Sequence, residues 1–345
     1  MNIQNEIIEK TPLLTKDGMI LNPGYCKRNL YEYNRENISA SVMRLKEWDF
    51  YQISDGKVMV QINFFNISLA SCITFAVIDL KTGKKLDAMS VELFTPHKNR
   101  MNKNGDVPNY FEYSRGGTKI KFDVKETIRH LYFEGKAKGK KIKADFTCFK
   151  MPEQESITMA TPFQKSGHFF YTQKLNCLNT FGTVSVGSET YEFKKDETFT
   201  VLDWGRGVWT YSNMWYWANG STMLNGKLFG FELTFGFGDE KNATETAVFY
   251  DGKCHKISAV KIENDPETNE GWMNSWHFTS EDGRLDLTMK PFYDYYTITA
   301  LPFFVLGIKS HQVHGLWSGS VILDDGTKLE IKDMYAFCEK VHNKW

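Results

Sequence analysis

Turn-forming dipeptides divide this chain of 345 residues into short segments. Both residues of an Asn-Gly or Asp-Gly pair tolerate the positive φ angles of tight hairpin turns. Such pairs begin at positions 17, 55, 104, 219, 225, 251, 282 and 325. Most lie between runs such as 57–63 and 119–124, in which apolar and polar residues alternate and so place apolar side chains on one strand face. We therefore predict an all-β fold of antiparallel hairpins with few short helices.

The length favours two modules, because 345 residues exceed what one hydrophobic core usually fills. The alternating pattern breaks at 151–162, where two prolines flank a cluster of Glu, Gln and Ser. We predict an N-terminal domain over 1–155 and a C-terminal domain over 156–345, with one large β domain as the alternative. Eight of the nine tryptophans fall in the second domain, so we expect a dry, indole-lined cavity inside it.

Composition excludes several classes of function. The 42 basic and 42 acidic side chains cancel, which disfavours nucleic-acid binding. Six cysteines without C-x-x-C spacing indicate reduced thiols rather than a zinc site or disulfides. We find no Gly-rich phosphate loop, nucleophile elbow or H-E-x-x-H motif, and so expect no cofactor or metal. With no secretory leader and no run of transmembrane length, we expect a cytoplasmic protein.

The segment 201–221 holds four tryptophans. If it runs extended, one face carries Asp203, Trp209, Tyr211, Trp215 and Trp217, and the other carries Trp204 and Arg206. An aromatic face with a few polar groups resembles the lining of a site for a large apolar molecule. Glycines at 205 and 207 weaken the assignment beyond them, because glycine in a strand often marks a bulge or a close backbone approach. The alternative is core packing, with Asp203 and Arg206 as a structural ion pair.

Candidate catalytic groups follow from this segment and from the strand predicted over 227–237. A carboxyl in an apolar cavity has a raised pKa and serves as a general acid, a role open to Asp203 or Glu232. Arg206 completes the candidate set, although a guanidinium beside Asp203 would keep that carboxylate ionised. The candidate ligand contacts are Trp204, Trp209, Tyr211, Trp215, Trp217, His168, Lys174, Glu245 and His311, and for each a structural role stays open.

Several motifs in order carry a family resemblance. They are Asp203-Trp204-Gly205-Arg206-Gly207, the segment 168–174, Glu245 within 243–247, the segment 310–315 and the tail 339–345. Together they resemble a bacterial family known as domain of unknown function 2804, although Ala336-Phe337-Cys338-Glu339 stands where Gly-Phe-Ala-Glu is expected. That family is more distantly similar to paired lipocalin-like proteins: carotenoid hydratases, tocopherol cyclase and Diels-Alderases. The resemblance implies two lipocalin-like antiparallel β-barrels in tandem and a polyene- or terpenoid-sized ligand, and it supplies no catalytic residues.

Three functions stay open, in this order. The first is cofactor-independent hydration, isomerisation or cyclisation of a hydrophobic polyene- or terpenoid-like molecule, with indole π faces stabilising a carbocation. The second is a non-catalytic carrier of such a ligand. The third is a carbohydrate-active β protein, which would need two close carboxylates beside an open cleft. The first two share one partner, a hydrophobic small molecule.

Overall fold

The computed structural model of the protein describes residues 4–267, 271–300 and 306–344. Within these ranges the regular structure is all strand apart from two single-turn 3₁₀ helices, Arg35–Asn37 and Val42–Arg44. The all-β prediction is confirmed. Most predicted turns also lie between strands; Asn225 and Gly226, for example, join two strands with φ angles of 53° and 75°. Asn219-Gly220 does not form the turn that its sequence predicts, because it lies inside a strand where Gly220 packs closely against Ala336 and Met334.

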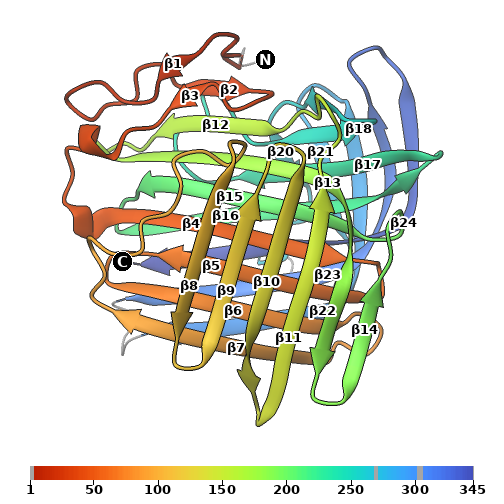
Figure 1. Ribbon diagram of the computed structural model, residues 1–345. Coiled ribbons are helices and arrows are strands. Elements are labelled where there is room, and N and C mark those ends of the chain that lie inside the picture. Colours follow the sequence, from red (N-terminus) through yellow and green to blue (C-terminus); the bar gives the residue numbers. More distant parts are fainter. Residues whose placement is uncertain (1–3, 268–270, 301–305, 345) are drawn as a thin grey trace.

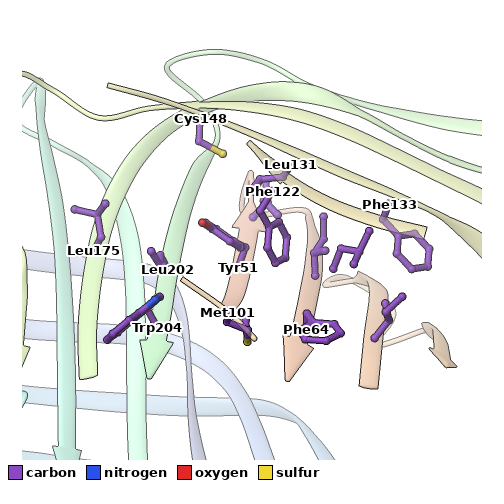
Figure 2. Packing of buried hydrophobic residues seen from close by; sticks show 14 of the residues in the cluster. Tyr51, Phe64, Met101, Phe122, Leu131, Phe133, Cys148, Leu175, Leu202 and Trp204 are labelled. Atoms are coloured by element: carbon purple, nitrogen blue, oxygen red, sulfur yellow. The ribbon is translucent and has the colours of Figure 1, made fainter. Parts of the chain in front are cut away.

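The first sheet curls until its two ends face each other. Its strands follow the order β7 (Lys85–Leu93), β6 (Ala70–Asp79), β5 (Val58–Asn66), β4 (Leu45–Ser54), β15 (Phe199–Val208), β13 (Phe169–Val186), β11 (Lys140–Phe149), β10 (Ile128–Ala137), β9 (Thr118–Val124) and β8 (Asn109–Arg115). In Figure 1, β8 to β11 lie across β4 to β7. Phe75 on β6 stacks on Phe133 on β10 with ring centroids 4.1 Å apart, so the enclosed space is a packed core. Figure 2 shows this packing around Tyr51, Phe122 and Leu131.

Short strands complete this half of the molecule. They are β1 (Thr11–Pro12), which pairs in parallel with β3 (Tyr31–Glu32); β2 (Gly24–Cys26), which pairs with β12 (Ile157–Pro162); and β14 (Glu189–Phe193), which pairs with β13. The long strand β13 carries a bulge between Leu175 and Leu178, where Cys177 has a φ of 59°. A bulge bends its strand. The first part of β13 therefore pairs with β12 and the last part with β11 and β14.

The second sheet forms a half-barrel. Its order is β19 (Lys253–Lys256), β18 (Ala247–Tyr250), β17 (Lys227–Phe235), β16 (Ser212–Leu224), β24 (Lys328–Lys344), β23 (Gly307–Ile322), β22 (Leu285–Ala300), β21 (Trp276–Ser280) and β20 (Val260–Ile262). Trp317 on β23 fills its interior and contacts Phe231 and Phe278 at centroid distances of 5.0 and 4.7 Å. The fold thus contains two barrel-like sheets in tandem.

The chain passes from the first sheet to the second between Val208 and Ser212, not near residue 155 as the sequence predicts. Residues 156–208 belong largely to the first sheet, because β13 pairs with β11 and β15 pairs with β4. The proline-flanked break at 151–162 covers only the loop between β11 and β12 and the short strand β12. Composition marks a loop there, but it does not reveal which strands pair across it.

The outward face of the first sheet packs against the second sheet. Alternation along β4 directs Tyr51 and Ile53 into the first core, and leaves Trp48 and Phe50 on the opposite face. Phe50 contacts Trp217 of β16 at a centroid distance of 5.9 Å. A small apolar cluster joins the sheets nearby: Met59, Ala76, Ile78 and Leu80 with Trp217 and Phe337. The two sheets therefore share one continuous interface.

Gly205 on β15 provides a test of how closely this interface is packed. It pairs with Trp48 on β4, and a methyl group at Gly205 would lie 1.9 Å from the indole ring of Trp48. We expect Gly205→Ala to lower the free energy of unfolding, measured by urea denaturation, by about 1–3 kcal/mol, the usual cost of overpacking. In a Trp48→Leu background there is space for the added methyl group, so Gly205→Ala should lower the free energy of unfolding by clearly less. Equal costs in the two backgrounds would show that Gly205 and Trp48 are not in close contact.

Candidate functional site

A pocket of about 290 Å³ lies between the two sheets. This volume is at the small end of the range for ligand pockets. The first sheet contributes Trp48, Phe50, Asn63, Phe65, Phe170, Lys174 and Asp203; the second sheet and its connections contribute Trp209, Trp215, Trp217, Phe237, Glu245, Gln312 and Glu339. The expected cavity inside the second barrel is therefore wrong. Trp276 and Trp317 are fully buried and fill that interior, and the pocket lies outside it.

Aromatic rings form most of the pocket wall. Trp209 contacts Trp48, Trp215 and Phe237 at centroid distances of 5.3, 5.8 and 4.7 Å, mostly edge to face. Alternation along β16 directs Trp215 and Trp217 toward the first sheet, whereas Tyr216 between them packs in the second core. Edge-to-face contacts hold such rings in fixed orientations. The wall is thus a preorganised apolar surface.

Lys174 is the buried cation of the pocket. It lies directly opposite Asp203 on the neighbouring strand, and only 3% of its surface is exposed. Its Nζ lies 2.5 Å from Asp203 Oδ1 and 3.5 Å from Glu245 Oε1, and 4.8 Å from the centre of the Trp217 ring. Burial alone would lower the pKa of Lys174, but the nearby carboxylates raise it above its usual value. The ammonium therefore stays charged at neutral pH.

Glu339 on β24 is a carboxyl group that is about half protonated at neutral pH. Removal from water raises its pKa to about 7, the negative charge of Asp203 adds to this, and a hydrogen bond from Trp215 Nε1 at 3.2 Å opposes it. It lines the pocket beside Trp217, its register partner on β16. A half-protonated carboxyl in an apolar pocket can donate a proton to a bound molecule.

Glu232 on β17 lies beyond the wall of the pocket. It is fully buried, and it accepts hydrogen bonds from Trp217 Nε1 at 2.6 Å and from Asn176 Nδ2 at 3.0 Å. Burial raises its pKa to about 8 although Lys174 and these donors lower it. Burial likewise raises the pKa of Glu245. One ammonium thus stands among four carboxyl groups, and the two that form no ion pair with it, Glu232 and Glu339, have pKa values raised to about 8 and about 7.

The pocket brings together six of the residues predicted from sequence. They are Asp203, Trp209, Trp215, Trp217, Lys174 and Glu245. Glu232 is joined to this set by the hydrogen bond from the Trp217 indole. The predicted assignment of Asp203 to one face of its strand, and of Trp204 and Arg206 to the other, agrees with the structure.

Arg206 and Trp204 lie in the interior of the first sheet, away from the pocket. Arg206 is fully buried, donates to Asp49 Oδ1 at 2.9 Å and to Asn102, and lies 4.1 Å over the Trp204 ring. The alternative that paired Arg206 with Asp203 is wrong, because residues three apart on a strand point to opposite faces. Its position gives Arg206 a structural role, and Trp204 packs in the first core.

Three other predicted contacts also lie outside the pocket. Tyr211 is 43% exposed in the link between the sheets. The Nδ1 of His168 lies 3.2 Å from the Ser166 carbonyl oxygen, within its own loop. His311 stacks on Trp272 with centroids 3.6 Å apart and hydrogen-bonds Asp294. None of the three lines the pocket.

Sequence reasoning missed Glu339 and the first-sheet residues Trp48 and Phe50. Glu339 carries a signal in hindsight, since it is an acidic residue directly after the apolar run 335–338. Trp48 and Phe50 carry none, because alternation shows that they share a face but not what covers that face. Among the described residues, no group of three or more His, Cys, Asp or Glu side chains is arranged to hold a metal ion. In the same part of the chain no helix is long and apolar enough to span a membrane.

Comparisons with known proteins agree with this architecture. Among solved structures, the chain is similar to kievitone hydratase from Nectria haematococca, with a TM-score of 0.52, 11% identity and coverage of 90% of this chain and 91% of that one. It is also similar to an AttH-like protein from Nitrosomonas europaea, with a TM-score of 0.44, 11% identity and coverage of 90% and 96%. At such identities the likeness to the hydratase concerns the fold alone. A search of curated proteins finds no match.

The family model described as "Domain of unknown function (DUF2804)" matches residues 4–345. This match covers almost the whole chain, both sheets and all the residues of the pocket. The chain therefore belongs to the domain of unknown function 2804 family.

Proposed function

We propose that this protein binds a hydrophobic small molecule between its two sheets and, without a cofactor, protonates a carbon–carbon double bond in it. Hydration is the reaction that we favour. The observation that carries the proposal is Glu339, a carboxyl with a pKa of about 7 in a pocket walled by indole and phenyl rings. The similarity in fold to a protein named as a hydratase supports the choice of reaction by analogy only.

The first step is proton transfer from the neutral carboxyl of Glu339 to one alkene carbon. The π electrons form the new C–H bond and leave a carbocation at the other carbon. Indole π faces, such as that of Trp217, attract positive charge. The carboxylate of Asp203, which forms an ion pair with Lys174, adds fixed negative charge to the pocket.

The second step adds water. A lone pair of water forms the C–O bond, and the resulting oxonium returns a proton to the carboxylate of Glu339. The net change is addition of one water to the double bond, and the acid is restored. If a neighbouring carbon instead loses a proton to the Glu339 carboxylate, the double bond moves. If a second alkene of the same molecule attacks the cation, a ring forms, and the new cation then loses a proton to the same carboxylate. Isomerisation and cyclisation therefore share the first step with hydration.

A carrier without catalysis would use the same pocket, and it remains the second candidate. The carbohydrate-active alternative has less support. More than half of the lining side chains are aromatic or aliphatic, which favours an apolar ligand over a polyhydroxylated sugar.

Replacing the proposed acid tests the chemistry. We propose incubating the protein with a panel of terpenoid alkenes in heavy-oxygen water and detecting the labelled alcohol by mass spectrometry. Glu339→Gln should lower kcat at least about a hundredfold, the usual contribution of a general acid, while ligand affinity changes little. Glu330→Gln, on the same strand but exposed, is the matched control and should retain activity. Binding without turnover in the wild type would identify a carrier, and the absence of binding would refute the proposal.

The pH dependence of turnover gives a second test. Because the protonated form of Glu339 is the donor, kcat should be highest below pH about 7 and fall as the pH rises through that value. The measurement is kcat for the alkene that turns over, across pH 5 to 9, for wild type and Glu330→Gln. A rate that instead rises through neutrality would assign the critical group as a base.

The raised pKa of Glu339 also predicts a change in stability. In the folded state this carboxyl keeps its proton up to pH about 7, whereas unfolded it loses it near pH 4.5. The protonated carboxyl therefore adds to the free energy of unfolding of the wild type at low pH, and this contribution is lost as the pH rises from about 4.5 to about 7. Relative to wild type, Glu339→Gln should gain about 3 kcal/mol in the free energy of unfolding between pH 4.5 and 7.5. A difference that is constant with pH would mean that the pKa is not raised.

A further inference from the structure

A hydrogen-bonded chain of polar side chains ends at the proposed acid, Glu339. The Tyr335 hydroxyl contacts His314 Nδ1, and His314 Nε2 lies 3.2 Å from Gln312 Oε1. Gln61 Nε2, from β5 of the first sheet, lies 3.2 Å from the same oxygen. Gln312 and His314 are two residues apart on β23, so both side chains point toward the first sheet. The chain therefore links both sheets to the acid.

The protonation state of His314 fixes the direction of these hydrogen bonds. His314 is fully buried, and burial lowers its pKa to about 3, an effect that the charge of Lys85 increases. The neutral ring carries one N–H. Because Gln312 Oε1 can only accept, that N–H lies on Nε2, and Nδ1 accepts from the Tyr335 hydroxyl. His314 and Gln61 thus both donate to the Gln312 oxygen.

With its oxygen held in this way, the Gln312 amide turns its nitrogen toward Glu339. The two residues are register partners on neighbouring strands, and both line the pocket. Burial raises the pKa of Glu339, and hydrogen bonds donated by Trp215 and Gln312 oppose this rise. An indole N–H cannot accept a hydrogen bond, and the accepting oxygen of Gln312 points away. Neither neighbour therefore takes the acidic proton, which is left for a ligand.

We propose that Gln312 is a positioning residue of this site: its amide donates to the Glu339 carboxyl, and His314 and Gln61 keep its oxygen turned away from the acidic proton. In the opposite orientation the amide oxygen would accept that proton and compete with the alkene. This inference rests on the proposed function, because it concerns how Glu339 gives up its proton. It also gives a role to two residues of the motif segment 310–315.

The charged groups around Glu339 stay unchanged when this chain of hydrogen bonds is altered. Those that line the pocket are Lys46, Glu47, Lys174, Asp203 and Glu245, and Glu232 lies behind the Trp217 ring. Asp203 raises the pKa of Glu339 and Lys174 lowers it. None of these residues lies on β23. A substitution of Gln312 or His314 that changes the titration of Glu339 therefore acts through the hydrogen bonds.

Infrared difference spectroscopy of the full-length protein measures this titration without a ligand. Subtracting the spectra of Glu339→Gln, made in each background, isolates the carboxyl C=O band of Glu339 across pH 4 to 9. In the wild type the midpoint should lie near pH 7. Gln312→Leu removes the donor and His314→Phe releases the amide. Each should raise the midpoint by about one pH unit or more, the size of one hydrogen bond to a charged group.

Two further variants serve as controls. His314→Gln retains an N–H that donates to the Gln312 oxygen, and should return the midpoint to the wild-type value. His311→Phe is the matched substitution on the same strand, at a residue that stacks on Trp272 outside the pocket. It should leave the midpoint unchanged.

The outcomes separate this inference from the proposed function. If Gln312→Leu does not raise the midpoint, or if His311→Phe raises it equally, the role of the amide is overturned. If His314→Phe does not raise it, or if His314→Gln does not reverse the rise, the orienting role of His314 is overturned. In each of these cases Glu339 remains the acid. A wild-type midpoint near 4.5, the ordinary value for Glu, would instead refute the proposed function itself.

Discussion

The ammonium of Lys174 is buried where the two sheets meet, and the arrangement of the pocket depends on it. It comes from β13 of the first sheet, pairs with Asp203 of β15, and reaches Glu245 in the connection that follows β17 of the second. The Trp217 ring of β16 covers it. Because removing one partner of a buried ion pair leaves an unpaired buried charge, these contacts restrict how the sheets can pack. The interface is therefore held by charge as well as by apolar contact.

An excess of carboxyl groups around this cation explains the chemistry that we propose. Lys174 compensates Asp203 and Glu245, while the further carboxyls Glu232 and Glu339 are removed from water and lie near the negative charge of Asp203. Both effects favour their protonated forms. Glu232 is sealed behind Trp217, whereas Glu339 lines the pocket. Because of their different positions, Glu232 has a structural role, whereas Glu339 can reach a ligand.

Much of the fold, and part of the site, could be predicted from the sequence. Turn pairs such as Asn225-Gly226 and alternating runs are local signals, and they identified the all-β class. The two-residue period also placed Asp203 and Arg206 correctly on opposite faces of their strand, because the face that a side chain occupies depends only on its position along that strand. Strand pairing is not local. Strand β15 lies beside β4, which is more than a hundred residues away in sequence. Three features depend on this pairing: the crossing between sheets at 209–211, the partner of Arg206 and the contribution of Trp48 to the pocket.

The most direct test of a ligand site between the sheets is a crystal structure of the protein with geraniol. We predict density for the ligand against Trp217 and Trp209, with its apolar chain near Glu339. Density inside the second half-barrel against Trp276 and Trp317, or a pocket filled only by water at saturating geraniol, would contradict the account.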